Sequence, residues 1–396
     1  MSRYIRSLPT ADSSAPNAPS LGNYKLIIAC TNLVYFALSP FAVLCLTLLY
    51  VLEPRPFPSW TLSRQISTGL AKLSQCISGW WIPPPPEDWD DWGISPPGQS
   101  FLDAQVRRLV SLKVITLQPV DKKYIIGIAD VQGVQSVQRA GFWISPRASL
   151  RRNDEPAKKG EKVIMHIHGG GYIRGHPMWT TFPMDIANAT GLRCLSVNYR
   201  KTLSASTAFP APLLDVLAGY LYLTQTLGFS PRDVIILGES AGAHLALFLS
   251  QYLRDLGLPQ AGYLFLSSPW ADFTLTYANS QTQIRKAYCH LTPFRLRRAV
   301  KSAMRYYTPS FLDAGYASPA KMISGGWDYL VKEQVRVYVH YGGKELFCVE
   351  IEALGKGLKG DGVDVRMRLD PNGVHTSAMS GEAGEVFKKD VLEILS

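Results

Sequence analysis

Short apolar runs alternate with helical patterns over the last two thirds of the chain, and this order limits the folds that are open to it. Six runs are rich in β-branched and aromatic residues, and they lie at 163–168, 194–199, 234–237, 263–267, 335–341 and 363–369. Apolar residues at helical spacing follow at 212–227, 242–256, 345–358 and 382–395. Because apolar strands must be covered on both faces, we predict an α/β fold with a mostly parallel central sheet flanked by helices. Two further runs, at 124–130 and 141–145, are also predicted to be strands.

One connection in this pattern is too long for a simple crossover. About 65 residues separate the run at 263–267 from the run at 335–341, whereas structureless connections longer than about 12–15 residues are uncommon in compact domains. We therefore expect a helical cap inserted around 274–318, within a single domain at 138–396.

An uncharged stretch precedes this domain. Lys25 and Glu53 bracket 27 apolar residues at 26–52, and a bilayer core needs about 20. A cleaved secretory signal would have an apolar region of about 7–15 residues and a small-residue cleavage site; a buried core helix is the other alternative. We predict a transmembrane anchor at 26–52, tilted or bent at Pro40, after an N-terminal tail at 1–25.

The segment between the anchor and the domain, 53–137, is rich in Pro and Trp. Four prolines at 83–86 are flanked by Trp80, Trp81, Trp89 and Trp92. We predict a linker and an N-terminal cap segment here, and a stiff spacer at the membrane surface and a structured cap are equally open. Basic residues before and after the anchor are nearly balanced, so the positive-inside rule does not orient it.

Composition excludes several classes of protein. Apolar residues make up 46% of the chain and charged residues 18%, which is typical of a globular protein rather than a disordered one. The net charge of +10 can indicate nucleic acid or an anionic membrane, but Lys and Arg are scattered, so we expect no nucleic-acid partner. The basic helix expected at 295–305 is interpreted as a solvated cap face, with contact to anionic headgroups as the alternative. Six cysteines without a CxxC pair indicate neither a zinc site nor a disulfide framework.

The sequence GESAG at 238–242 carries the strongest chemical signal. It follows the apolar run 234–237 and opens the helical pattern 242–256. In this context G-x-S-x-G is typical of a nucleophile elbow, in which glycines let strand and helix approach and the serine projects at the carboxyl edge of the sheet. The helix N-terminus behind the serine favours negative charge there. We predict that Ser240 is a nucleophile.

A triple glycine ends the run at 163–168, in the sequence HGGGY at 168–172. The glycines leave backbone N–H groups uncovered, and neither phosphate-loop pattern, G-x-G-x-x-G or G-x4-G-K-[ST], is present here. Acyl transfer needs donors aimed at the developing oxyanion. We predict that the N–H groups of Gly170, Gly171 and Ala241 form this oxyanion hole, and that His168 orients the loop.

A serine nucleophile needs a base, and histidine is the usual one. The chain has seven histidines, at 166, 168, 176, 244, 290, 340 and 375. His375 alone follows the last predicted strand, which is the position of the base when the chain order is serine, acid, histidine. We predict His375 as the base and structural roles for the others. The pair His166 and His168 lacks further ligands for a metal.

The base in turn needs a carboxylate that holds its tautomer. Glu345 follows the strand predicted at 335–341 and stands 30 residues before His375, so it is the favoured acid. Asp328 is the rival, although it precedes that strand. Asp370 is close to His375 in sequence and is assigned to the turn.

These motifs, in this order and spacing, resemble the hormone-sensitive-lipase-like group of α/β-hydrolases, which includes arylacetamide deacetylases and fungal steryl acetyl hydrolases. The resemblance covers about residues 138–395, and it is carried by HGGGY, GESAG, Glu345 and His375, with Tyr199-Arg200, Pro210-Ala211-Pro212 and Asp215 ahead of the elbow. It implies an α/β-hydrolase fold. The chain departs from the group where Glu345 replaces a frequent Asp, and where 201–204 replaces a Leu-Ala-Pro-Glu run.

The resemblance also implies a location. A single N-terminal span is similar to the deacetylase and steryl acetyl hydrolase members, whose catalytic domain faces the lumen of the endoplasmic reticulum. We therefore expect a single-pass protein of that membrane with a lumenal catalytic domain.

Together these features predict a membrane-anchored serine carboxylester hydrolase. We expect it to act through an acyl-enzyme on a small lipophilic ester, such as an acetylated sterol, terpenoid or other metabolite, without metal or organic cofactor. The predicted partners are this ester and the lipid bilayer, and the oligomeric state is left open. An acyltransferase that uses the same residues and a non-catalytic ligand receptor on the same fold remain as alternatives.

Overall fold

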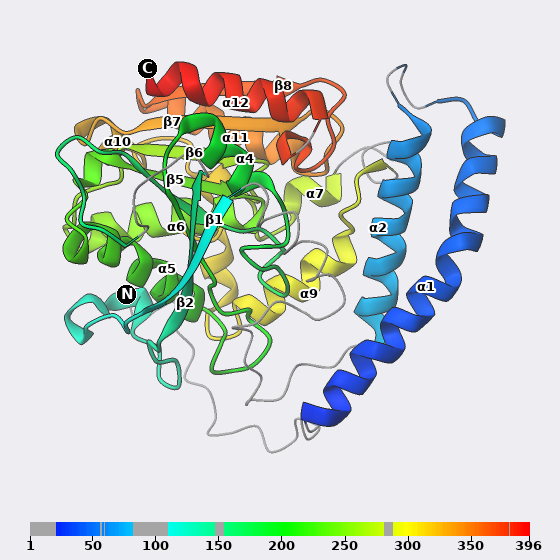
Figure 1. Cartoon of the computed structure of the whole chain (residues 1–396), viewed down its shortest axis with the longest axis horizontal. Coiled ribbons are helices and arrows are strands. Elements are labelled where there is room, and N and C mark those ends of the chain that lie inside the picture. The colour runs from blue at the N-terminus through cyan, green and yellow to red at the C-terminus, as the bar shows by residue number, and fades with distance from the viewer. Residues whose placement is uncertain are drawn as a thin grey trace.

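The structure is a computed structural model of the 396-residue chain. It describes residues 21–55, 58, 60–81, 110–146, 154–280, 288–379 and 381–396. Two N-terminal helices stand beside an α/β domain (Figure 1). The predicted features at prolines 83–86, Trp89 and Trp92 lie outside the described residues.

A central eight-stranded sheet has the order β1-β2-β4-β3-β5-β6-β7-β8. The strands are β1 (Val110–Leu117), β2 (Arg139–Pro146), β3 (Val163–Ile167), β4 (Cys194–Val197), β5 (Val234–Glu239), β6 (Tyr263–Ser267), β7 (Arg336–Gly342) and β8 (Asp364–Asp370). β2 pairs antiparallel with β1 and with β4, and the other neighbours pair in parallel. The predicted mostly parallel sheet is confirmed. Because β3 to β8 run in one direction, the residues that follow them gather at one edge.

Helices cover both faces of this sheet, as Figure 1 shows. One face packs against α5 (Ala211–Leu221), α6 (Ala241–Asp255) and α11 (Cys348–Gly360), and the other against α4 (Phe182–Thr190) and α12 (Gly381–Leu395). Strand β3 is buried along its whole length, as expected for a strand between two helical layers.

Shorter helices connect these elements. They are α7 (Thr276–Ser280), α9 (Pro293–Ala303), α10 (Asp328–Lys332), the π-helix η4 (Tyr222–Thr226), and the 3-10 helices η5 (Pro231–Asp233), η6 (Pro309–Asp313), η7 (Pro319–Lys321) and η8 (Ser377–Met379). Helices α7 and α9 lie within the insertion expected at 274–318.

One strand predicted in the first part of the domain is wrong. Residues 124–130 are not a strand but lie around the 3-10 helices η2 (Lys122–Tyr124) and η3 (Gly127–Ala129). The hydroxyl of Tyr252 on α6 donates to the Tyr124 carbonyl oxygen at 2.7 Å and accepts the Ile126 N–H at 3.0 Å. These bonds take the place of the backbone hydrogen bonds that a neighbouring strand would make. The sheet begins instead with β1, ahead of the boundary expected at residue 138.

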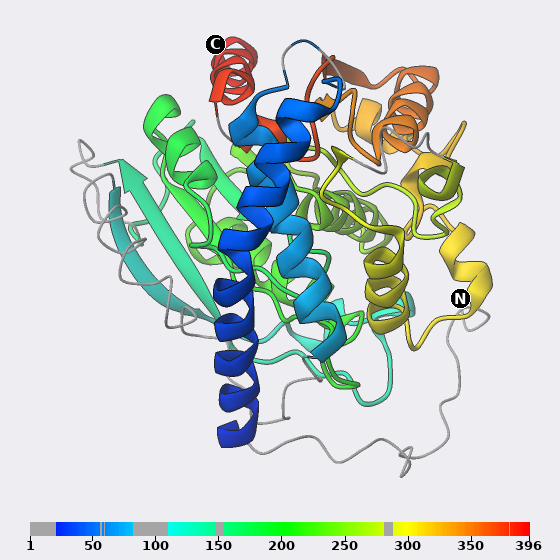
Figure 2. The same cartoon turned by 90° about the vertical axis from the view of Figure 1, so that its right-hand side faces the viewer.

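The N-terminal helices α1 (Leu21–Leu52) and α2 (Leu62–Trp81) lie side by side (Figures 1 and 2). Helix α1 contains Pro40 and is curved. Its stretch Leu26–Leu52 has a mean hydropathy of 2.1 and is long and apolar enough to cross a membrane, a test that a signal sequence also passes. Several of its large apolar side chains are exposed, among them Leu33, Phe36, Phe41 and Leu52.

Candidate active site

Ser240 lies in a sharp turn between β5 and α6. Its backbone dihedrals, φ 54° and ψ −119°, are in a region that L-residues seldom adopt. A Cβ on Gly238 would lie 2.7 Å from the carbonyl oxygen of Gly242, so glycine is needed for the strand and the helix to approach. The Ser240 N–H donates to the Ser267 carbonyl at 2.9 Å, which joins the turn to β6. The predicted elbow therefore has the expected backbone geometry.

The structure brings together three side chains that come from separate parts of the chain. His375 Nε2 lies 2.8 Å from Ser240 Oγ, and His375 Nδ1 lies 2.7 Å from Glu345 Oε2. Ser240 is 8% exposed, His375 4% and Glu345 0%. Because an ionised carboxylate only accepts hydrogen bonds, Nδ1 donates to Glu345 and the lone pair of Nε2 faces the serine hydroxyl. In this tautomer the imidazole can take the serine proton.

Hydrogen bonds between loops hold these side chains in place. The second oxygen of Glu345 accepts the Gly342 N–H at 2.9 Å. The loops that follow β7 and β8 are joined by the Gly343 N–H, which donates to the Asp370 carbonyl at 2.8 Å. The Thr376 N–H donates to Ser268 Oγ at 2.9 Å. The glutamate is therefore held by the backbone of its own loop, and the loop of His375 is held by bonds to the loops that follow β6 and β7.

The rival carboxylates lie elsewhere. Asp328 is exposed at the start of α10, where it pairs with Lys332 at 2.7 Å. Asp370 accepts the Asn372 N–H at 3.3 Å within the turn after β8. Among the described residues, Glu345 is the carboxylate that the structure brings to His375.

The triple-glycine loop packs directly against the elbow. A Cβ on Gly169 would lie 3.2 Å from the Cβ of Ser240. Gly170 and Gly171 have φ values of 115° and 63°, which favour glycine. Within the described part of the chain, no group accepts a hydrogen bond from either of their N–H groups. Ala241 is the first residue of α6, and N–H groups in a first helical turn have no partner within the helix. Gly170 and Gly171 line the same cavity as Ser240, and the oxyanion hole stays a prediction.

Sequence reasoning missed Glu239, the residue before the serine. Its Oε1 accepts the Gly169 N–H at 2.8 Å, and its Oε2 lies 2.8 Å from His166 Nε2. The other ring nitrogen of His166 lies 2.6 Å from Ser196 Oγ. Glu239 therefore ties the glycine loop to the elbow. A carboxylate and a histidine near the same end of the neighbouring strands β5 and β3 are the signal that could have revealed this pair.

The other histidines have structural surroundings. His168 stacks on Tyr199 with ring centroids 4.2 Å apart, and its Nδ1 lies 2.7 Å from the Gly169 carbonyl oxygen, which agrees with a role in orienting the loop. His244 Nδ1 lies 2.6 Å from the hydroxyl of Tyr172. Burial lowers the pKa of His244 to about 3, so this ring is neutral near pH 7. The described residues contain no group of three or more His, Cys, Asp or Glu that could hold a metal ion.

A cavity of about 320 Å³ opens onto Ser240 and His375. The glycine loop, the elbow and the segment around α9 line it. Its apolar lining includes Trp179, Trp270, Leu291, Leu296 and Phe347. Residues of the segment 290–299 therefore form part of the cavity wall.

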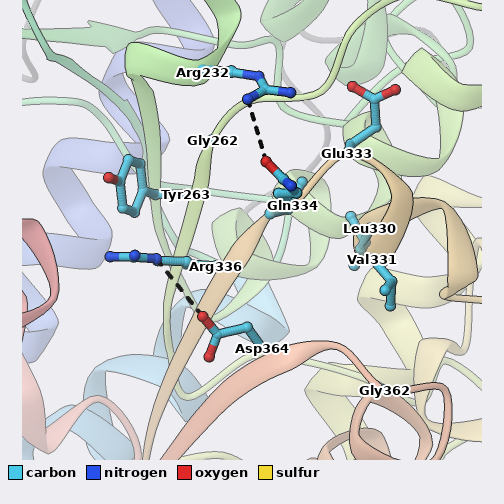
Figure 3. Close-up of a pocket in the computed structure, with 11 residues that line it drawn as sticks. Arg232, Gly262, Tyr263, Leu330, Val331, Glu333, Gln334, Arg336, Gly362 and Asp364 are labelled. Carbon is cyan, nitrogen blue, oxygen red and sulfur yellow. Dashed lines mark hydrogen bonds and ion pairs between the residues drawn. The ribbon is translucent and has the colours of Figure 1, made fainter.

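A second cavity, of about 480 Å³, lies at the opposite edge of the sheet (Figure 3). Tyr263, Arg336 and Asp364, the first residues of β6, β7 and β8, line it. Arg336 and Asp364 approach to 3.7 Å there. This cavity is far from the elbow because Ser240 follows the carboxyl end of its strand.

Comparisons with known proteins agree with this geometry. A family model described as the alpha/beta hydrolase fold matches residues 164–379, more than half of the chain. An acetyl-hydrolase of Streptomyces hygroscopicus is 33% identical over 129 residues, which cover 32% of this chain and 42% of that protein. The esterase LipU of Mycobacterium tuberculosis is 25% identical over 235 residues, which cover 56% of this chain and 71% of that protein. The matches span less than half the length of the first curated relatives.

Solved structures show the same fold. The hormone-sensitive-lipase homologue EstE7 from a metagenome library superposes with a TM-score of 0.57 at 20% identity, over 84% of this chain and 97% of that chain. An esterase from the bacterial hormone-sensitive lipase family gives 0.56 at 20% identity, over 86% and 92%. The chain therefore belongs to the α/β-hydrolase fold family. The solved structures that share this fold include hormone-sensitive-lipase homologues, the group that the motifs HGGGY and GESAG resemble.

Proposed function

We propose that this chain is a serine carboxylic ester hydrolase. The observation that carries the proposal is the continuous line of hydrogen bonds from Ser240 through His375 to Glu345, with distances of 2.8 and 2.7 Å. The names of the relatives, which include acetyl-hydrolases, esterases and carboxylesterases, support the same chemistry.

The reaction would proceed in two halves. His375 Nε2 takes the proton of Ser240 as Oγ attacks the ester carbonyl, and Glu345 stabilises the imidazolium. The N–H groups of Gly170, Gly171 and Ala241 donate to the tetrahedral oxyanion. The imidazolium then protonates the leaving alcohol, which leaves an acyl group on Ser240. Water, deprotonated by His375, attacks this acyl-enzyme and releases the acid.

The cavity favours a small acyl group beside Ser240. A volume of about 320 Å³ is at the lower end of small-molecule sites. Its tryptophans and leucines favour lipophilic substituents. We propose an acetylated or other short-chain ester of a lipophilic alcohol, such as a sterol, terpenoid or related metabolite, whose bulk extends beyond the cavity. We also propose that α9 and its flanks form the cap of the domain.

Helix α1 is proposed to anchor this domain in a membrane. Exposed Leu and Phe side chains on a 32-residue helix favour lipid contact. We propose that the catalytic domain faces the lumen of the endoplasmic reticulum, by analogy with the deacetylase and steryl acetyl hydrolase members. Protease treatment of sealed microsomes tests the orientation, since a lumenal domain is protected until detergent is added. Cleavage of the intact domain in sealed microsomes would contradict it.

The central test of the proposed activity compares the purified chain with Ser240→Ala on aryl esters of acetic to long-chain acids. We expect hydrolysis that is fastest for short acyl groups, and a fall of at least about 10⁴-fold in kcat for Ser240→Ala. Addition of a lipophilic alcohol separates hydrolysis from acyl transfer, because a transferase would yield a new ester. If both forms are equally inert while an ester still binds, the chain is a receptor and the proposal is wrong.

A further inference from the structure

Two arginines line the cavity above Ser240. Arg174 lies three residues after the triple-glycine loop, and Arg295 lies in the first turn of α9. The two side chains belong to different walls of one cavity, and the charge of Arg174 is among the causes that lower the pKa of Arg295. The site thus contains two guanidinium groups that the proposed chemistry does not use.

Neither guanidinium has a counter-ion in the described part of the chain. The Nη1 atom of Arg295 is buried and has no hydrogen-bond partner there, and neither side chain forms an ion pair with a described carboxylate. Glu239, the carboxylate among the described lining residues, is engaged by His166 and the Gly169 N–H, and Glu345 is engaged by His375 and the Gly342 N–H.

The other basic groups near the cavity add positive charge or are neutral. Burial, and then the charges of Arg174 and Arg298, lower the pKa of Arg295 to about 10. Burial lowers the pKa of His290 to about 3, with contributions from His375, Arg174 and Lys72. An arginine keeps its charge under these conditions. Arg295 is half-buried and its buried Nη1 atom has no partner among the described residues; such a group lowers stability, so its presence beside a cavity favours an anionic ligand.

We infer that the ester hydrolysed at this site carries an anionic group, a carboxylate above all, that binds between Arg174 and Arg295. The guanidinium fork matches the two oxygens of a carboxylate, which gives orientation as well as affinity. The same cavity presents Trp179, Trp270 and Leu296 to the apolar part of the molecule. The substrate class is therefore an amphiphilic ester, with its charge held near the reacting carbonyl on either the acyl or the alcohol side. This inference rests on the proposed hydrolase function.

Two matched pairs of esters test it and locate the charge. On the alcohol side, 3-acetoxybenzoate is compared with 3-acetoxybenzamide; on the acyl side, the 4-nitrophenyl monoester of adipic acid is compared with that of adipamic acid. Each pair differs by a carboxylate against an amide of nearly equal size. For at least one pair, we expect kcat/KM of the wild-type protein to be on the order of tenfold or more higher for the carboxylate.

Variants assign the preference to the arginines. Arg295→Gln and Arg174→Gln should each bring the ratio of the two kcat/KM values close to one, while kcat/KM for the amide partner changes less than about threefold, which also shows that the variants fold. Arg295→Lys should keep part of the preference. Arg297→Gln is the matched control, since Arg297 lies on the same helix, is exposed and does not line the cavity; it removes the same charge and should keep the full ratio.

The outcomes separate the two proposals. If the amide esters are hydrolysed at least as fast as the carboxylates, or if the preference survives both glutamine variants, the inference is wrong and the hydrolase function stands. If no ester in the panel is hydrolysed faster than by Ser240→Ala, the hydrolase function is wrong and the inference fails with it.

Discussion

Replacement of Glu345 by Gln is the sharpest test of the proposed mechanism. Both oxygens of Glu345 accept hydrogen bonds, from the Gly342 N–H at 2.9 Å and from His375 Nδ1 at 2.7 Å. A glutamine side chain has one acceptor oxygen and one NH2 donor. Because a backbone N–H cannot change its role, the amide oxygen stays on Gly342 and the NH2 group faces Nδ1. The imidazole must then carry its proton on Nε2, which points that proton at Ser240.

The imidazole of the variant is therefore held in the tautomer that cannot accept the serine proton. The corresponding change of an aspartate to asparagine in a serine protease lowers kcat about 10⁴-fold, and a factor of this size corresponds to about 5.5 kcal/mol in activation free energy. We expect a similar loss in kcat here, with KM changed only slightly because Glu345 is fully buried behind the histidine and does not face the ester.

The assay is steady-state hydrolysis of an aryl acetate from pH 6 to pH 10. The control is Asp328→Asn, which makes the same change of charge on the exposed rival acid and should keep full activity. Thermal unfolding of both variants excludes loss of the fold. If Glu345→Gln retains more than about a tenth of the wild-type kcat, or Asp328→Asn loses most of its activity, the assignment of the acid is wrong.

Three further predictions concern the supports of the site. Gly170→Ala should lower kcat about 10²–10³-fold, because φ is 115° and a Cβ would lie 2.7 Å from the Arg174 carbonyl carbon; unchanged kcat for an aryl acetate would contradict this. Glu239→Ala should lower the free energy of unfolding by about 1–3 kcal/mol, because the Gly169 N–H and His166 lose their acceptor. Glu239→Gln should leave the free energy of unfolding nearly unchanged, because His166 can exchange tautomers. An equal loss in both variants, measured by urea unfolding, would refute this account. Glu350 is buried and its pKa is raised well above the ordinary value, first by burial and then by Asp272. The folded state therefore binds the proton more tightly than the unfolded state, so stability should fall as pH rises above about 4.5. Glu350→Gln should remove this slope, and a slope that persists in the variant would assign it to another group.

The positions of the main site residues could be predicted because the residues that follow parallel strands lie at the same edge of the sheet, in an order set by the strand order. Ser240, Glu345 and His375 follow β5, β7 and β8 in turn, and the residues after parallel strands share one edge. The glycine motifs add local conformational requirements that few other residues satisfy. These signals need no knowledge of side-chain packing.

Strand β1 and the role of Glu239 could not be predicted in this way. The segment 124–130 has a strand-like composition, but a distant phenol, that of Tyr252, satisfies its backbone. Among the described residues the edge strand β1 pairs with β2 alone, so its sequence need not be apolar on both faces, and it lies within the segment that the sequence predicts to be a linker and cap segment. The link from Glu239 to Gly169 depends on the register between β3 and β5, which sequence alone does not reveal.

The orientation of α9 is a further feature that the sequence does not reveal, and it decides which of the basic residues of this helix lines the cavity. Five basic residues of this region, Arg295, Arg297, Arg298, Lys301 and Arg305, were interpreted together as a solvated face. The buried side chains of α9 are Leu296, Ala299, Val300 and Ala303. At 100° per residue Arg295 lies on one side of this stripe, whereas Arg297 lies on its other side and Arg298 opposite it, and both are exposed. Packing of the small and branched residues thus turns one guanidinium of the series toward Ser240 and leaves its neighbours in solvent. The net charge of the sequence does not distinguish these arginines, but the rotation of the helix makes Arg295 part of the cavity wall. Substitution of Arg295 should therefore change the substrate preference, and substitution of Arg297 should not.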